Sequence, residues 1–159
     1  RNDGKKDSSI AELSTLKPIY VSSASPGSKI IYDYSAGQSI KITSEKNGKV
    51  ESNEKFMMPN AYFDGFLGEY LLGALPLKAG YTAQFEIYNG NKKQNSITLI
   101  KQVIEDVLIT NHGKPIPVYL VIVDIADIEI LYSIDKNTKE ILKSVYSFGD
   151  GRYFIKSRV

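Results

Sequence analysis

The sequence predicts a mainly β protein in which a strongly curved antiparallel sheet, a half-barrel or open barrel, wraps around one amphipathic helix. Val, Ile, Tyr, Phe and Thr recur in short alternating runs between Gly, Asn, Asp and Pro, which is typical of half-buried strands. The loops between these runs are short, so neighbours along the chain should pair antiparallel, in about 9–10 strands. One stretch near residues 63–75 has a helical period instead, and we expect it to cover the apolar face of the sheet.

The N-terminal part of the chain should form antiparallel strands joined by tight turns. Asn47-Gly48 is the strongest hairpin signal, because a type I′ turn needs positive φ at both central residues and these two tolerate it. The strands expected on either side of these turns cover residues 17–24, 29–35, 38–45 and 48–56.

The helix is predicted from apolar residues at i, i+3, i+4, i+7, i+8 and i+11. They are Phe63, Phe66, Leu67, Tyr70, Leu71 and Ala74. Asn60 or Asp64 would cap its start, and Pro76 would stop it, since proline lacks the amide that continues the helix.

Glycines interrupt this helix on its rear side. Gly65 and Gly68 lie near Leu72, with Gly73 to one side, and a glycine inside a helix costs about 1 kcal/mol relative to alanine. Either the helix packs closely against another backbone or a ligand, or tertiary packing simply overrides the weak helix propensity.

The C-terminal half predicts a meander of further strands. Residues 96–104 and 106–111 read as two strand pieces broken near Glu105, whereas residues 117–125 are apolar on both faces and should be central. Tight turns are expected at 111–114 and 135–139. The remaining strands are expected over residues 81–87, 128–134, 141–148 and from 152 onward.

Length and composition indicate one domain. Residues 1–9 form a polar leader that we expect to be flexible, and residues 10–159 form a single β-rich domain. The formal charge of +2, from 20 basic and 18 acidic side chains, argues against nucleic acid as a partner. No apolar run approaches the roughly 20 residues that span a bilayer.

The sequence offers no recognisable catalytic or metal-binding motif, so we expect a non-enzymatic protein without cofactor or metal. His112 is the only histidine and sits in an Asn-His-Gly-Lys turn, and there is no cysteine. Asp124, Asp127 and Glu129 cluster at a bend but lack the spacing of a calcium loop.

Basic residues gather on the last predicted hairpin. Two interpretations remain open, a local basic face and the usual use of lysine to discourage edge pairing. The residues are Lys139, Lys143, Arg152, Lys156 and Arg158.

Two stretches carry a family resemblance. Residues 58–81, with the helix end Ala-Leu-Pro-Leu-Lys-Ala-Gly-Tyr, and the turn Tyr132-Ser-Ile-Asp-Lys-Asn-Thr138 resemble an uncharacterised family of exported bacterial β-rich domains, catalogued as a domain of unknown function. The turn is also similar to lipoprotein carriers and lipoprotein-sorting proteins of the LolA/LolB type. The resemblance implies an exported protein, periplasmic or associated with the outer membrane, with an apolar cavity for an acyl chain.

Two functions follow as hypotheses. The first is a cell-envelope module that binds a lipid, a lipoprotein acyl chain or another apolar ligand between the sheet and the helix. Its candidate ligand-binding residues are Met57, Met58, Phe63, Phe66, Leu67 and Tyr70. The alternative is a structural or protein-interaction domain of the envelope with a packed core, working through its convex face or an exposed edge strand.

Overall fold

The computed structural model describes residues 4–57, 63–89, 94–126 and 128–158. The chain divides into two compact units, Arg1–Gly68 with Tyr88–Asn95 and Glu69–Ile87 with Ser96–Val159. The sequence, in contrast, predicts one β-rich domain over residues 10–159.

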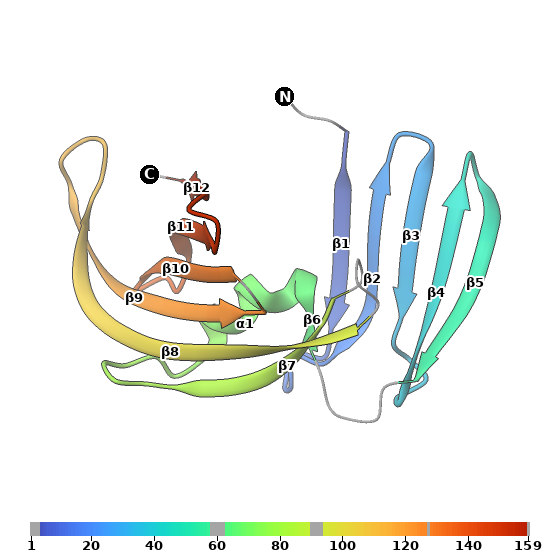
Figure 1. Ribbon diagram of the computed structural model, residues 1–159, viewed down its shortest axis with the longest axis horizontal. Helices are drawn as coiled ribbons and strands as arrows, with labels where there is room; N and C mark the ends of the chain where they lie inside the picture. Colours follow the sequence, from blue (N-terminus) through green and yellow to red (C-terminus); the bar gives the residue numbers. More distant parts are fainter. Residues whose placement is uncertain (1–3, 58–62, 90–93, 127, 159) are drawn as a thin grey trace. The chain divides into compact units, whose positions relative to one another are not determined.

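The described residues form twelve strands, one 3₁₀ turn and one short helix, so the mainly β prediction is confirmed. The first sheet has the order β1-β2-β3-β4-β5, and the second has the order β12-β11-β10-β9-β8-β7-β6 (Figure 1). The elements are β1 Lys6–Ala11, β2 Pro18–Ser25, β3 Ser28–Asp33, β4 Ser39–Lys46, β5 Lys49–Met57, β6 Phe63–Asp64, η1 Gly65–Leu67, α1 Gly68–Ala74, β7 Ala83–Asn89, β8 Gln94–Ile109, β9 Pro115–Ile125, β10 Ile128–Asp135, β11 Ile141–Phe148 and β12 Tyr153–Ser157.

The expected single curved sheet is thus replaced by a five-stranded and a seven-stranded sheet, and a half-barrel wrapped around the helix is not confirmed. The physical reason is that the apolar residues collect in two separate buried clusters, one in each compact unit. Alternation along a strand shows that one face is buried, but it does not show which other strands share that face.

The five-stranded sheet is an antiparallel meander closed by the predicted hairpin turn. Asn47 and Gly48 have φ values of 50° and 76°, which confirms the turn between β4 and β5. One boundary differs from the prediction: Lys6–Ala11, which begins inside the expected flexible leader, pairs with β2 as β1. Its polar side chains fit this position because the strand is held through its backbone and is almost entirely exposed.

The core of the first unit is aromatic. Tyr32 and Tyr88 pack edge to face with ring centroids 6.3 Å apart, and the Tyr34 hydroxyl donates a hydrogen bond to the buried carboxylate of Asp64. Burial raises the pKa of Tyr32, and the nearby Asp64 raises it further. The buried members of this cluster are Val21, Tyr32, Tyr34, Ile40, Ile42 and Tyr88.

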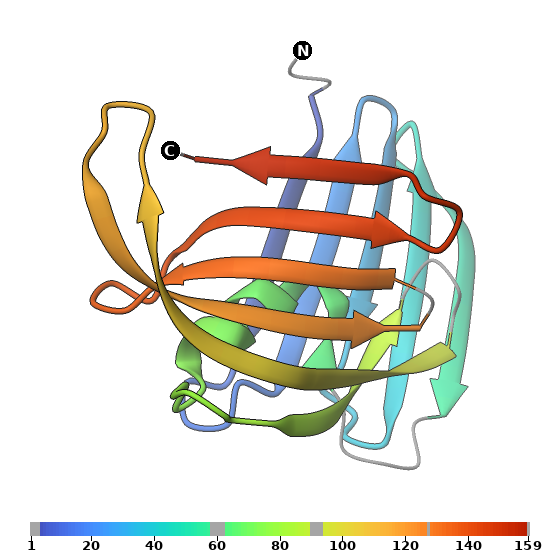
Figure 2. The ribbon, with the colours of Figure 1, turned by 60° about the vertical axis from the view of Figure 1, so that its left-hand side comes forward.

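The seven-stranded sheet contains the long curved strands β8 and β9 (Figures 1 and 2). The predicted break near Glu105 is wrong, because β8 runs continuously from Gln94 to Ile109. Its irregularity is instead a register shift between Ile100 and Gln102, where one extra residue is absorbed as a bulge. The turns at 111–114 and 135–139 are confirmed by hydrogen bonds from Thr110 to Lys114 and from Lys139 to Asp135.

One face of this second sheet packs against α1 and the turn after it. Leu72 and Leu77 are buried in the same cluster as residues from strands β8 to β11. The strand residues of this cluster are Ile100, Val103, Val121, Val123, Ile130, Tyr132, Ile134 and Ile141. We call this side of the sheet the inner face.

The helix is shorter than predicted, and its faces are assigned differently. It begins at Gly68, because Phe63–Asp64 is strand and Gly65–Leu67 is a 3₁₀ turn. A 3₁₀ turn has about three residues rather than 3.6, so it changes the phase of the pattern read from Phe63. Tyr70 is 74% exposed, whereas Leu67 and Leu71, expected on the same side, are buried. The prediction that Pro76 stops the helix is confirmed, since α1 ends at Ala74.

The predicted rear side of the helix is the side that packs on the sheet. Glu69, Leu72 and Gly73 stand at i, i+3 and i+4, and all three contact the second unit's strands and turns. A Cβ atom at Gly73 would lie 2.8 Å from the carbonyl oxygen of Lys139, in the turn before β11. The glycine here is therefore explained by close approach to another backbone, as one of the sequence-based alternatives holds.

Replacement Gly73→Ala should lower the free energy of unfolding by about 1–2 kcal/mol. Alanine gains up to about 1 kcal/mol in helix propensity, but overpacking against a backbone carbonyl costs about 1–3 kcal/mol. Chemical denaturation measures the difference.

The matched control is Gly149→Ala, because a Cβ at Gly149 meets nothing within 4 Å. We expect this variant to unfold at the midpoint of the unmodified protein. A Gly73→Ala variant as stable as the control would contradict the close-approach explanation.

Candidate functional site

Strand β12 is the most exposed apolar edge of the second unit. It stands last in the order of its sheet and pairs with β11. Tyr153, Phe154 and Ile155 are 71%, 57% and 47% exposed. Natural edge strands are normally shielded by charge, proline or a covering segment, so three consecutive exposed apolar residues are unusual at such a position.

The hydrogen bonds of β12 fix which of its backbone groups point outward. The Arg158 amide donates to the Leu142 carbonyl at 2.9 Å, and the Phe148 amide donates to the Arg152 carbonyl at 2.9 Å. The backbone N–H and C=O groups of the even-numbered residues of β12 therefore point toward β11, since hydrogen-bonded pairs alternate along an antiparallel ladder. The backbone N–H and C=O groups of Tyr153 and Ile155 consequently point away from the sheet.

Side chains on β12 alternate between the two faces of the sheet. Phe154 packs against Tyr146 on the inner face with ring centroids 5.8 Å apart, and Tyr146 packs against Tyr132 at 6.5 Å. Lys156, two residues after Phe154, also points to the inner face and reaches α1. Tyr153 and Ile155 lie on the opposite, outer face.

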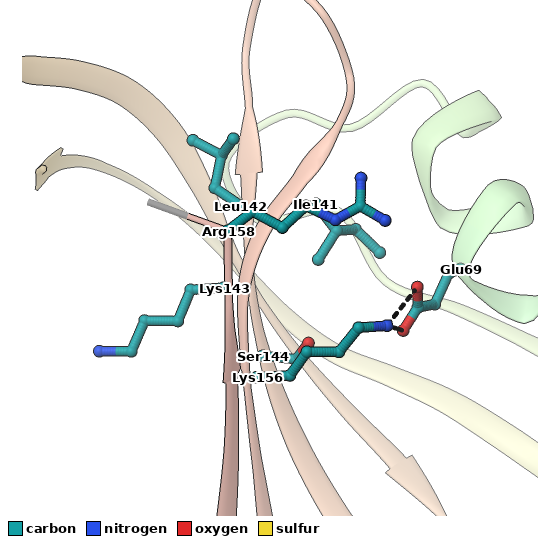
Figure 3. A pocket seen from close by; sticks show the side chains of 7 residues that line it. All are labelled: Glu69, Ile141, Leu142, Lys143, Ser144, Lys156 and Arg158. Carbon is teal, nitrogen blue, oxygen red and sulfur yellow. Dashed lines mark hydrogen bonds and ion pairs between the residues drawn. The ribbon is translucent and has the colours of Figure 1, made fainter. Parts of the chain in front are cut away.

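A shallow pocket, with no room for an enclosed water molecule, lies where α1 meets β11 and β12. Figure 3 shows that the side chains of Lys156 and Arg158 extend toward the side on which Glu69 lies, whereas the Lys143 ammonium points the opposite way. The lining residues are Glu69, Ile141, Leu142, Lys143, Ser144, Lys156 and Arg158. We call this the edge pocket.

The Glu69 carboxylate is the centre of the polar contacts in the edge pocket. The Lys156 ammonium donates to both of its oxygens, at 3.1 and 3.3 Å, and the Tyr146 hydroxyl points to it at 3.5 Å. Burial raises the pKa of Tyr132 strongly, and the neighbouring Tyr146 and Glu69 add to the rise. A chain of polar groups thus links α1 with β10, β11 and β12.

Three polar groups of the edge pocket have no partner within the part of the chain that the structure describes. The Ser144 hydroxyl is buried without a hydrogen bond. The Arg158 guanidinium and the Lys143 ammonium make no ion pair there, whereas Lys156 is neutralised by Glu69. Of the two unneutralised cations, Arg158 points to the side on which Glu69 lies, and Lys143 points away from it (Figure 3).

The predicted ligand-binding residues do not share one environment. Met57 is 63% exposed at the end of β5, Tyr70 is exposed on α1, and Leu67 is buried in η1. Phe63 is half-buried in β6. The backbone of Phe66 lies in η1, whereas Met58 and the side chain of Phe66 lie outside the described residues. None of the four whose side chains are described lines the edge pocket.

The histidine and the described carboxylates considered for catalysis or metal binding lie at the surface or form ion pairs. His112 is exposed in the turn between β8 and β9. Asp124 and Glu129 both pair with Lys101, at 3.3 and 2.9 Å, and Asp127 lies outside the described residues. No group of three metal-ligating side chains occurs among the residues whose placement is described.

The structure divides the basic residues of the last hairpin. Lys143, Lys156 and Arg158 meet at the edge pocket. Arg152 instead pairs with Asp150 at 2.7 Å, and Lys139 lies over the Tyr119 ring. Sequence reasoning missed Glu69 and Ser144, although the spacing of Glu69 with Leu72 and Gly73 was a usable signal for the packed side of the helix.

The fold and the site define a mainly β protein with one short helix, whose candidate site is the edge of a sheet. The chain belongs to DUF3108, a family of proteins of unknown function, whose family model matches residues 1–156. The predicted membership of a domain of unknown function is confirmed, but the match says nothing about lipoprotein carriers or export. Comparisons with curated proteins and with solved structures found no match. Among the described residues, no helix has the length and apolar character needed to cross a membrane.

Proposed function

We propose that the chain is an exported, non-enzymatic cell-envelope domain that binds an extended segment of another protein along β12. The observation that carries this proposal is the outward-facing backbone of Tyr153 and Ile155 on an exposed apolar strand. Addition of a strand to such an edge satisfies its free backbone groups, while neighbouring side chains select the sequence that binds.

Charge favours a different protein over a second copy of this chain. Lys156 and Arg158 stand at the edge pocket, and the five residues of β12 include no acidic side chain. Pairing of β12 with another β12 would bring these cations close to one another, which is unfavourable across neighbouring strands. A segment with carboxylate side chains would meet complementary charge.

The alternative ligand is a lipid or lipoprotein acyl chain held between a curved sheet and the helix. That hypothesis needs free space on the inner face beside α1. Leu72 and Leu77 are packed there against the strand residues, and the edge pocket is shallow. These contacts favour the interaction domain, which is the second of the two functions that the sequence suggests.

Export is supported by the resemblance of residues 58–81 and 132–138 to exported bacterial domains. Fractionation of cells that produce the natural full-length protein should recover it from the periplasm or the outer membrane. Recovery in the cytoplasmic fraction alone would contradict the proposed location.

Binding along β12 should protect particular amides from hydrogen exchange. We expect a short capped peptide of alternating valine and glutamate to slow exchange at Tyr153 and Ile155 by about tenfold or more. In Ile155→Pro the outward amide is lost while the ladder with β11 is kept, so the protection at Tyr153 should disappear.

The matched control is Ile155→Thr, which keeps the amide and a β-branched side chain. It should bind the peptide nearly as well as the unmodified protein, and all three proteins should melt at similar temperatures. Equal binding by the proline variant, or no protected amide in the unmodified protein, would overturn the proposal.

A further inference from the structure

We propose that the partner segment places a carboxylate side chain across the mouth of the edge pocket, where Arg158 binds it and thereby fixes the register of the added strand. This inference rests on the proposed binding at β12. It identifies Arg158 as a specificity-determining residue and an acidic, alternating sequence as the partner chemistry.

The faces of β12 determine the pattern that a partner must have. A strand added beyond β12 places its side chains alternately on the two faces, in step with the residues opposite. Residues of the partner on the outer face would lie beside Tyr153 and Ile155, which favours apolar side chains there. Residues on the inner face would lie beside Phe154, Lys156 and Arg158.

Of the three basic residues that line the edge pocket, Arg158 is the unpaired one that points to the side of Glu69, whereas the Lys143 ammonium points away (Figure 3). Lys156 already donates to both oxygens of Glu69, so a new carboxylate beside it would compete with that pair. Arg158 has no such partner among the described residues. An arginine fork binds a carboxylate through two parallel hydrogen bonds, which gives direction as well as attraction.

The walls of the edge pocket suit a side chain rather than a larger ligand. Ile141 and Leu142 supply apolar surface for methylene groups, and the Ser144 hydroxyl lacks a partner among the described residues. The pocket is shallow and has no room for an enclosed water molecule, so a partner side chain would lie across its mouth. A glutamate side chain matches this surface, because its methylene stem can contact Ile141 and Leu142 while its carboxylate meets Arg158.

A panel of capped peptides tests the inference. The parent peptide alternates valine with threonine, and each variant replaces one threonine with glutamate. Fluorescence anisotropy of labelled peptides measures their affinities. We expect glutamate at one position to tighten binding about tenfold over the parent, since a hydrogen-bonded charge pair contributes roughly that factor.

The gain should vanish in Arg158→Gln and persist in Lys114→Gln, a matched control because Lys114 is an exposed cation beside β9 that does not line the edge pocket. A charge exchange adds a second test: Arg158→Glu should prefer the peptide with lysine at that same position.

The possible outcomes separate the inference from the proposed function. Protected amides at Tyr153 and Ile155 with equal affinity for every peptide would overturn the role of Arg158 and leave binding along β12 intact. A glutamate preference that survives Arg158→Gln would also overturn it. Absence of amide protection with every peptide, including the alternating valine-glutamate one, would overturn the proposed function itself.

Discussion

The contact between Glu69 and Lys156 is the interaction on which the edge of the second unit depends. It joins α1 to β12 across 87 residues of sequence, and Tyr146 on β11 points to the same carboxylate. The two side chains are 32% and 48% exposed, and pairs with such exposure contribute only about 0–1 kcal/mol. The contact therefore positions the edge more than it stabilises the unit.

Stability comes instead from the apolar cluster beneath that contact. Full burial of a Val, Leu or Ile side chain contributes about 1.5–3 kcal/mol, and this cluster contains ten buried residues. Leu72 brings α1 into the cluster, and Gly73 lets the helix approach the Lys139 carbonyl closely enough for this packing. With α1 held in this way, Glu69 can reach Lys156 without cost to the core.

Features set by neighbouring residues could be predicted from the sequence. Asn47-Gly48 forms its turn because the conformations of these two residues decide it, and Pro76 limits the helix because it lacks an amide. The division into two sheets could not be predicted in this way. It depends on which buried faces share a core, and that is decided by contacts between distant residues.

The candidate site also depends on contacts between distant residues, which the sequence pattern does not show. The basic residues of the last hairpin were visible in the sequence, but their use depends on Glu69, which reaches them only after α1 packs. Tyr70 was expected at a ligand site because the helical pattern was read from Phe63, whereas the helix begins at Gly68. The changed start leaves Tyr70 exposed, although Leu67 and Leu71 of the same predicted side are buried.

Hydrogen exchange at the inward-facing amide of Arg158 tests most directly whether Glu69 holds the edge in place. That amide bonds to the Leu142 carbonyl, so it exchanges only when β12 separates from β11. In Glu69→Gln it should exchange roughly two to five times faster, the factor expected from loss of one partly exposed ion pair, while Glu140→Gln should leave it unchanged. An exchange rate unaffected by Glu69→Gln would show that β12 is positioned without this contact and would contradict the account.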